Sequence, residues 1–364
     1  MKITYDNIVF SLQRAGGISV YWAKLIMGLS SRDINISYYG DRSNNIFAKN
    51  LKIKVRKESI IPTNILRYLP FRRRLDTGSL FHSSYYRVSL QKDIKNVVTV
   101  HDFTHEYFRS GLARFVHHNQ KKFALKKADG IICVSESTKK DMLKFFPGIK
   151  NKPIRVIHLA ASDDFTVENR THDVSKEFKK IGNIKYILYV GSRANYKNFD
   201  YVVHAIKKLP SYKLVVVGEE FSVKEARVLK DNLKDRFKLI KHPSIEELSF
   251  LYRRAFCFIY PSSYEGFGIP ILEAMQSGCP VVALRTSSIP EVSGEAALLM
   301  DRLSINSIIE QVRSLEKGQT RDRLIKAGLE QSRKFSWDRC VDQTYDFYRE
   351  LIINKTQDGH EIEV

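Results

Sequence analysis

The sequence lacks long apolar runs, paired cysteines, internal repeats and low-complexity segments. No stretch approaches the roughly 18 consecutive apolar residues of a transmembrane helix, and residues 1–5 show no signal-peptide core. The four cysteines, Cys133, Cys257, Cys279 and Cys340, form no CxxC or Cys/His cluster, which argues against structural zinc and predicts buried free thiols in a reducing compartment. We therefore expect a cytoplasmic protein that touches a membrane only peripherally.

The length and composition favour two packed domains. At 364 residues the chain exceeds the size at which a single core keeps growing, and 43% apolar residues with 11% aromatics are enough for well-packed interiors. The formal net charge of +20 is unevenly spread. Residues 1–170 hold 30 Lys and Arg against 14 Asp and Glu, whereas residues 171–364 hold 30 against 26.

The basic excess of the first half points to a polyanionic partner, either nucleic acid or an anionic membrane leaflet. Two segments concentrate it: residues 65–74, where bulky apolar residues alternate with arginines, and residues 112–127, which read as a strongly basic helix. A merely solubilising surface, with amphipathic helices and snorkelling arginines, is the alternative.

Short apolar strands alternate with helices along most of the chain, which predicts parallel sheets covered on both faces. The fold class is therefore α/β, with two Rossmann-like doubly wound domains in tandem. We predict strands at 96–100, 130–135, 154–158, 186–191, 213–218, 237–240, 257–260 and 281–284, with further short strands in 34–54 and a loop over 58–76. The predicted domains are residues 1–167 and 168–345, followed over 346–364 by a helix that can pack back on the first domain and an acidic tail.

The first domain offers candidate residues at the ends of its strands. Gly16 and Gly17 lie between the opening strand and a helix, as in a nucleotide-type βα unit, although many loops carry such a pair. His101-Asp102 follows one buried strand and Ser135 follows the next, where open α/β sheets bind ligands, so Asp102 and Ser135 are acceptor-side candidates. A metal site built on His101 and His105 is disfavoured, because no third histidine or cysteine ligand is recognisable.

The second domain contains two carboxylates around a glycine-rich turn, Glu265 and Glu273, eight residues apart. Eight residues span about 12 Å of helix, so the spacing predicts one carboxylate at a helix mouth and the other two turns down the same face. Gly266 and Gly268 let the backbone approach a ligand, and Pro270 suits a first helical position whose free N–H groups can bind an anion. Glu273 could instead merely complement a helix end.

Two cations precede this stretch. Gly191 and Arg193 follow one strand, and Lys197 comes four residues after the arginine at the start of the next helix. Together these features suit a diphosphate: a glycine turn, the forked guanidinium of Arg193, the ammonium of Lys197 and a helix N-terminus. Taken alone, the two cations could equally be surface charge.

The combined pattern resembles the donor-binding domain of glycosyltransferase family 4, whose members are retaining, nucleotide-sugar-dependent enzymes of the GT-B fold. The likeness rests on residues 186–200 and 243–295, on the E-x7-E spacing, and on the motifs Gly278-Cys279-Pro280-Val281-Val282 and Phe335-Ser336-Trp337. It covers essentially the whole second half and touches the first through Gly16-Gly17 and His101-Asp102. Two departures stand out: the arginine and the lysine are one residue closer than in many relatives, and His158-Leu159-Ala160-Ala161 replaces a Pro-Asn-Gly loop.

The resemblance implies a role for each matching residue. Arg193 and Lys197 would hold the donor diphosphate, Glu265 the hydroxyls of the transferred sugar, and Glu273 the ribose hydroxyls, while the backbone carbonyl of His101 would face the developing oxocarbenium. The implied catalytic residues are His101, Glu265, Arg193 and Lys197, and the implied donor-binding residues are Gly16, Gly17, Gly191, Gly266, Phe267, Gly268, Ile269 and Glu273.

The expected chemistry needs no bound metal or cofactor. No Asp-x-Asp signature stands out, so fixed cations would replace a divalent ion at the leaving diphosphate. Glu265 and Glu273 are not expected to form a hydrolase pair, which needs carboxyls about 5–5.5 Å apart.

We expect a hexosyltransferase of surface polysaccharide (O-antigen or capsule) synthesis, resembling mannosyltransferases of the family. The expected partners are a nucleotide-sugar donor, for which GDP-mannose is the first guess, a lipid-linked glycan acceptor and an anionic membrane surface met by the basic half. Three alternatives stay open: a transferase using UDP-sugars, a nucleic-acid-binding α/β protein, and a sugar-binding homologue without activity. The nucleic-acid alternative is disfavoured because no helix-turn-helix, RNP or zinc-finger pattern is present.

Overall fold

The computed structural model describes the whole chain except residues 33, 42, 50, 52, 169–173 and 358–364. The chain forms two compact units, residues 1–159 with 337–364 and residues 160–336. The predicted boundaries lay at 167/168 and 345/346. In the structure the first break follows Leu159, and the last helix joins the first unit from Trp337 onward. Part of the predicted acidic tail, residues 358–364, lies outside the described residues.

The first unit is built on a seven-stranded parallel sheet with the order β3-β2-β1-β4-β5-β6-β7. Its strands are β1 (Lys2–Asp6), β2 (Asn35–Tyr39), β3 (Val55–Arg56), β4 (Leu80–Ser83), β5 (Lys95–Val100), β6 (Gly130–Cys133) and β7 (Ile154–Val156). Its helices are α1 (Ile8–Leu12), α2 (Gly17–Ser30), α3 (Ile46–Lys49), α4 (Thr63–Leu66), α5 (Thr104–Phe108), α6 (Gly111–Lys127), α7 (Glu136–Phe145) and α16 (Trp337–Gln357), with a 3-10 turn at Pro147–Ile149.

The second unit repeats the plan with a six-stranded parallel sheet, order β10-β9-β8-β11-β12-β13. Its strands are β8 (Tyr186–Val190), β9 (Lys213–Val217), β10 (Phe237–Ile240), β11 (Cys257–Tyr260), β12 (Val281–Leu284) and β13 (Ala297–Met300). Its helices are α8 (Lys176–Gly182), α9 (Phe199–Lys207), α10 (Val223–Leu233), α11 (Ile245–Arg254), α12 (Ile269–Gln276), α13 (Ile289–Ser293), α14 (Ile305–Ser314) and α15 (Gly318–Ser332), with a 3-10 turn at Asn195–Lys197.

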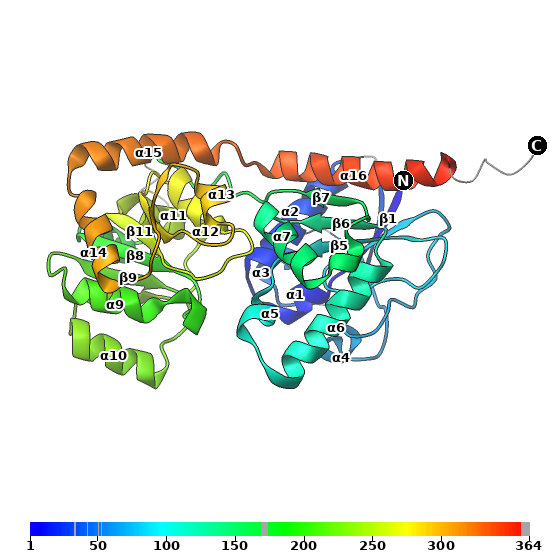
Figure 1. Ribbon diagram of the computed structural model, residues 1–364, viewed down its shortest axis with the longest axis horizontal. Coiled ribbons are helices and arrows are strands. Elements are labelled where there is room, and N and C mark those ends of the chain that lie inside the picture. Colours follow the sequence, from blue (N-terminus) through cyan, green and yellow to red (C-terminus); the bar gives the residue numbers. More distant parts are fainter. Residues whose placement is uncertain (33, 42, 50, 52, 169–173, 358–364) are drawn as a thin grey trace, which may run out of the picture. The chain divides into compact units, whose positions relative to one another are not determined.

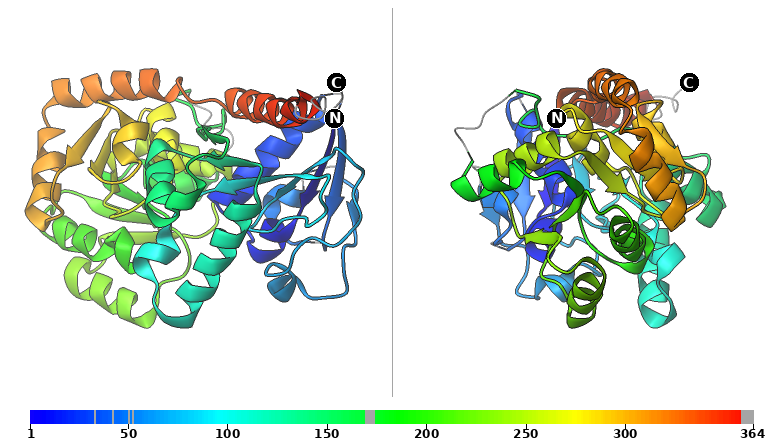
Figure 2. Two further views of the ribbon diagram at one scale, coloured as in Figure 1. Left: turned by 45° about the vertical axis from the view of Figure 1, so that its right-hand side comes forward. Right: turned by 90° about the vertical axis from the view of Figure 1, so that its left-hand side faces the viewer.

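Helices lie on both sides of each sheet (Figures 1 and 2), as the continuous apolar strands require. The predicted α/β class is confirmed. The strands predicted throughout 34–54 are partly wrong, because only β2 forms as expected and residues 46–49 are helical. The predicted loop over 58–76 contains the short helix α4.

Helix α16 packs against α2 and the start of β6 because two glycines allow it. A Cβ atom added at Gly28 would stand 2.7 Å from Cγ2 of Val341, and one added at Gly130 would overlap the side chains of Leu351 and Phe347. The apolar face of the last helix therefore completes the core of the first unit (Figure 1).

Both sheets reverse their strand order once, between β1 and β4 in the first and between β8 and β11 in the second. Loops leave the two adjacent strands in opposite directions at such a point, which opens a crevice beyond the carboxyl ends. In the second unit, Arg193, Lys197 and Glu265 follow the two strands at this reversal, whereas in the first unit His101 and Asp102 follow β5, one strand beyond it.

Candidate functional site

In the second unit, the loops that follow β8 and β11 are tied together at the point of reversal. Gly191 has a φ of +121°, which lets the chain turn away from β8. Asn198, itself left-handed with φ 56°, donates from Nδ2 to the carbonyl of Pro261 and to Oγ of Ser263, each at 2.7 Å. The amide therefore fixes the loop that carries Arg193 and Lys197 against the loop that carries Glu265.

Lys197 and Glu265 form an ion pair in this crevice. Their side chains keep 14% and 12% of their exposure, so the pair is sheltered but reachable from solvent. The ammonium also lies 5.4 Å from the centre of the Tyr260 ring. Burial, followed by the charge of Glu265, raises the pKa of Tyr260 and keeps its phenol protonated. The structure thus joins two of the predicted catalytic residues directly.

Arg193 is held by the protein on several sides. Its Nε contacts Oε1 of Glu225 at 2.8 Å, Nη2 donates to the carbonyls of Glu219 and Glu220 at 3.0 and 2.7 Å, and the guanidinium lies 4.8 Å from the Phe221 ring centre. Burial alone would raise the pKa of Glu225, but hydrogen bonds from Ser222 and Arg193 lower it. The remaining nitrogen, Nη1, is buried without a hydrogen-bond partner in the part of the chain that the structure describes.

The glycine-rich turn holds Glu265 before the helix rather than on it. Helix α12 begins at Ile269 with Gly268 (φ 110°) as its N-cap, so the prediction that both carboxylates share one helical face is wrong. The physical reason lies in two serines after β12: Ser287 Oγ accepts from the backbone N–H of Glu265 at 2.8 Å, and Ser288 Oγ donates to the carbonyl of Glu265 at 3.0 Å. These bonds hold the turn, including Gly266 and Phe267, in a non-helical path.

Glu273 lies in the second turn of α12 and has a different partner. The hydroxyl of Tyr252, on α11, donates to its Oε2 at 3.0 Å. Burial raises the pKa of Glu273 to about 7, and the Tyr252 hydrogen bond only partly opposes that shift. The two glutamates are therefore electrostatically distinct. Glu265 pairs with the ammonium of Lys197, whereas Glu273 accepts a hydrogen bond from the phenol of Tyr252.

In the first unit, a cavity of about 360 Å³ opens beside the carboxyl end of β5 and is lined in part by Gln13, Ile18, His101 and Asp102. The His101 ring stands edge-on to Tyr21 with 5.1 Å between ring centres. Burial, aided by the nearby Lys121 ammonium, lowers the pKa of His101 to about 4 although Asp102 opposes it, so the imidazole is neutral at pH 7. Its Nε2 is buried and has no hydrogen-bond partner among the described residues.

A buried ion pair holds the loop that carries His101 and Asp102. Lys121, on α6, donates from Nζ to the Asp102 carbonyl at 3.0 Å and to Oε2 of Glu106 at 2.9 Å, and its side chain is fully buried. Although burial opposes it, hydrogen bonds and charge from His117 and Lys121 lower the pKa of Glu106 to about 2. The sequence placed Lys121 on a basic surface helix, and only the packing of α6 over this loop reveals its buried role.

The other first-unit candidates have mainly local partners. Gly17 opens α2, and the carbonyl of Gly16 accepts from Ser19 Oγ at 2.8 Å. Ser135 is buried, caps α7 by accepting from the Thr138 N–H at 3.0 Å, and is not among the residues that line the cavity.

Several residues of the site were not predicted from the sequence: Asn198, Glu225, Tyr252, Tyr260, Ser287 and Ser288. For two of them a signal existed, because Tyr260 ends the predicted strand 257–260 and Ser287 follows shortly after the predicted strand 281–284. The predicted free thiols are confirmed, since all four cysteines are buried and unpaired. Within the described ranges, no group of three or more His, Cys, Asp or Glu side chains could hold a metal, and no helix is long and apolar enough to cross a bilayer.

Comparison with known proteins matches the two units to two glycosyltransferase family models. The family described as glycosyl transferases group 1 matches residues 172–331, and the family described as Glycosyltransferase Family 4 matches residues 15–164. The O-antigen chain mannosyltransferase B of Escherichia coli is 30% identical over 269 residues, which is 70% of this chain and 70% of that protein. The chain belongs to glycosyltransferase family 4.

Solved structures give this glycosyltransferase the GT-B fold. Sucrose-phosphate synthase from Thermosynechococcus elongatus is 19% identical with a TM-score of 0.75, covering 97% of this chain and 100% of that one. HepE from Anabaena, in complex with UDP-glucose, is 16% identical with a TM-score of 0.73, covering 96% and 100%. At such identities the likeness concerns the fold alone, which agrees with the prediction of tandem Rossmann-like domains.

Proposed function

We propose that this glycosyltransferase moves a hexose, with retention of anomeric configuration, from a nucleoside diphosphate to a lipid-linked glycan of surface polysaccharide synthesis. The observation that carries the proposal is the Lys197–Glu265 pair at the strand-order reversal of the second unit. It combines a cation suited to a diphosphate with a carboxylate suited to sugar hydroxyls in one sheltered crevice. GDP-mannose is the donor that we propose, because the curated relative named above is a mannosyltransferase.

The donor roles follow from charge. Departure of the diphosphate places negative charge on its oxygens and positive charge on the sugar, so fixed cations and nearby carboxylates act mainly in the transition state. We assign Arg193 and Lys197 to the diphosphate, Glu265 to the sugar hydroxyls and Glu273 to the ribose hydroxyls. Binding would require Lys197 to share Glu265 with the donor, and the partial exposure of both side chains makes this exchange possible.

These two cations would replace a divalent metal ion, so the reaction would need no cofactor. In the first unit, His101 is assigned to the reacting centre, as the family resemblance implies. Its neutral imidazole adds no positive charge that would repel a developing oxocarbenium. We also propose that the enzyme works at the inner face of the cell membrane, with its basic first unit toward anionic lipid.

A donor panel tests the proposal. Purified protein is incubated with GDP-mannose, other GDP-sugars or UDP-sugars and a lipid-linked acceptor, with and without EDTA, and the product is identified by mass spectrometry. We expect transfer from GDP-mannose that EDTA does not reduce, and a one-bond C1–H1 coupling, measured on the product by NMR, that shows retention. Turnover with UDP-sugars alone would overturn the donor assignment, and an inverted product would overturn the mechanism.

Loss of function in one variant separates an enzyme from a sugar-binding homologue. Glu265→Ala should abolish transfer, and the exposed Glu310→Ala on α14 should leave it unchanged. If Glu265→Ala retained full activity, the residue roles assigned here would be wrong. Oligonucleotide binding that falls steeply with salt, without any nucleotide-sugar binding, would favour the nucleic-acid alternative.

A further inference from the structure

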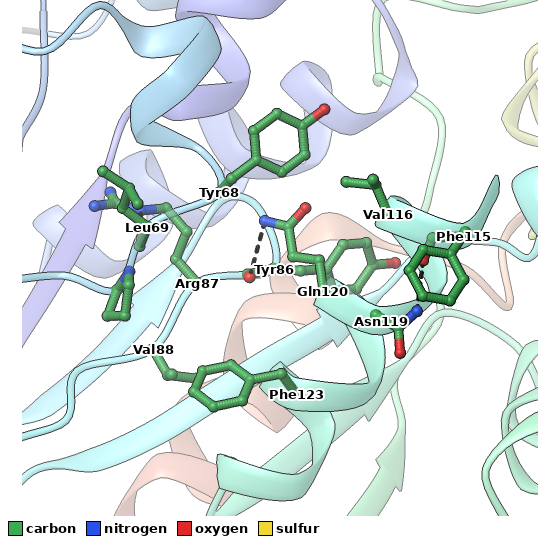
Figure 3. A pocket seen from close by; sticks show the side chains of 11 residues that line it. Tyr68, Leu69, Tyr86, Arg87, Val88, Phe115, Val116, Asn119, Gln120 and Phe123 are labelled. Atoms are coloured by element: carbon green, nitrogen blue, oxygen red, sulfur yellow. Dashed lines mark hydrogen bonds between the residues drawn. The ribbon is translucent and has the colours of Figure 1, made fainter. Parts of the chain in front are cut away.

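An apolar groove lies on the first unit between α6 and two loop segments (Figure 3). It has a volume of about 360 Å³, and the apolar side chains that line it include Tyr68, Leu69, Val88, Phe115, Val116 and Phe123. Figure 3 shows Phe123 of α6 reaching toward Val88, with Gln120 between Tyr68 and Tyr86. Val88 is 1% exposed and forms part of the floor, whereas Phe115 and Phe123 on the walls keep 66% and 43% of their exposure.

The open aromatic walls indicate a ligand rather than packing. Phe115, Phe123 and Tyr68 project from two different segments around one concavity, so their exposure is clustered. A clustered apolar concavity of this kind is typical of a binding site, whereas singly scattered exposed residues need no explanation. An apolar chain laid in the groove would remove all three rings from water.

The groove adjoins the cavity that is lined by His101. Tyr86 lines both spaces. Gln120 of α6 donates from Nε2 to the carbonyls of Arg67 and Tyr86, the latter at 3.2 Å, and so holds the two loop segments against the helix. One end of the groove therefore lies close to the cavity.

Arg67 stands at this junction. It lines the cavity, and its guanidinium lies 4.7 Å from the ring centre of Tyr68, a groove residue, and 5.0 Å from that of Tyr85, a cavity residue. Among the residues that the structure describes, Arg67 forms no ion pair with a carboxylate. Helix α6 adds four exposed cations, Arg114, Lys122, Lys126 and Lys127, and has no acidic residue. Arg67 thus offers a cation to an anion that lies between the groove and the cavity.

We propose that the groove holds the hydrocarbon chain of a lipid diphosphate, with Arg67 at its phosphates and the His101 cavity receiving the group beyond them. This assignment rests on the proposed function and names the part of the acceptor that the first unit recognises. A chain with an anionic diphosphate at one end matches an apolar groove that ends near a guanidinium whose contacts are with tyrosines rather than with a carboxylate. The occupant is a single lipid diphosphate rather than a bilayer surface, because the rings surround a concavity instead of forming a flat face.

Calorimetry with two probes, farnesyl diphosphate and farnesol, tests the groove on the full-length protein. Phe115→Ser and Phe123→Ser should each weaken farnesyl diphosphate binding about 10-fold, because each removes apolar contact with the chain. Leu112→Ser is the matched control, since Leu112 lies on the same helix, is 76% exposed and does not line the groove. It should leave the affinity unchanged.

A second pair of variants tests the phosphate end. Arg67→Gln should weaken farnesyl diphosphate binding about 10-fold while leaving farnesol binding unchanged, because only the diphosphate uses the guanidinium. Lys140→Gln removes an equal charge from an exposed position on α7 and should have no effect. Equal losses in Phe115→Ser and Leu112→Ser would indicate general surface adsorption and overturn the proposal. An Arg67→Gln protein with wild-type affinity would do the same.

Failure of the groove and failure of the proposed function can be told apart. Protein that binds farnesyl diphosphate as expected but turns over no nucleotide sugar would contradict the function and leave the groove assignment in place. Transfer from a nucleotide sugar to a water-soluble glycan, without measurable binding of farnesyl diphosphate, would overturn the groove assignment alone. GDP binding should be equal in all five variants, because each substitution lies in the first unit.

Discussion

The two units differ in how far their least exposed ion pairs are buried. In the first unit, the Arg87 guanidinium lies between Asp6 (3.2 Å) and Glu58 (2.6 Å), and none of the three side chains is more than 3% exposed. Lys121 and Glu106 are sealed in the same way. In the second unit, the pairs Lys197–Glu265 and Arg193–Glu225 keep exposures between 6% and 22%.

This difference distinguishes structural ion pairs from pairs that can accept a ligand. A sealed pair cannot exchange its partner without leaving a buried charge uncompensated, so it fixes the loops that it joins. A pair open to solvent can admit an anion beside its cation at smaller cost. The two units also differ in net charge. The first unit has 32 Lys and Arg against 18 Asp and Glu, whereas the second has 28 against 22. The excess of the first unit is therefore on its surface, not in its buried pairs.

The largest expected effect comes from breaking the sealed cluster. Arg87→Met leaves two buried carboxylates uncompensated and should lower the free energy of unfolding of the first unit by about 3–5 kcal/mol. Tryptophan fluorescence reports this unit alone, because the chain has two tryptophans, Trp22 and Trp337, and both belong to it.

The matched control is Arg155→Met, which breaks an exposed pair with Glu350 (2.7 Å, 37% and 51% exposed). It should change the free energy of unfolding by less than about 1 kcal/mol. If both variants lost the same stability, the distinction between sealed and exposed pairs would be wrong.

Breaking the solvent-accessible pair Lys197–Glu265 should reduce activity strongly and stability little. Lys197→Met should lower kcat for transfer about 10²- to 10³-fold, because it removes the cation that we propose to stabilise the leaving diphosphate, while the unfolding midpoint moves little. The measurement is initial transfer rate together with a far-UV circular dichroism melt. Lys241→Met removes the cation of an exposed pair with Glu220 in the same unit and should leave both quantities unchanged.

A pH series sharpens the comparison within the second unit. Because burial raises the pKa of Glu273 from 4.5 to about 7, the folded state keeps a proton that the unfolded state has already lost between these values. The free energy of unfolding should therefore fall as pH rises from about 4.5 to 7, by up to about 3 kcal/mol, and level off above.

Urea unfolding followed by circular dichroism from pH 5 to 8 measures this dependence. Glu273→Gln should remove the decline, whereas Glu310→Gln, at an exposed position on α14, should retain it. A Glu273→Gln protein with the wild-type pH dependence would show that the carboxyl is not the titrating group.

The smallest effect concerns a buried polar chain in the first unit. The Tyr348 hydroxyl meets Nδ1 of His82, whose Nε2 lies 2.9 Å from Oγ1 of Thr99, and that oxygen lies 3.1 Å from the hydroxyl of Tyr21 beside His101. Tyr348→Phe leaves the buried His82 without this partner and should lower stability by about 1 kcal/mol, measured by tryptophan fluorescence. Tyr345→Phe, on the same helix but partly exposed, should change it by less than about 0.5 kcal/mol.

Element types were largely predictable, while local exceptions were not. The bounds of β10, β11 and β12 match the predicted 237–240, 257–260 and 281–284, because short continuous apolar runs mark buried strands. Residues 46–49 form a helix against the strand prediction, and Glu265 sits in a turn instead of at a helix mouth. In the second case the deciding hydrogen bonds come from Ser287 and Ser288, more than 20 residues away.

The sequence by itself determined the alternation of strands and helices, the candidate residues at the strand ends and the free cysteines, because periodicity and strand-end position are local properties. Only the tertiary structure decided which charges meet. Lys197 pairs with Glu265, which lies 68 residues away in the sequence. Lys121 is buried and pairs with Glu106, although it belongs to a helix rich in basic residues. Such pairings depend on the order of strands in a sheet and on how each helix packs over it, and no local pattern encodes either.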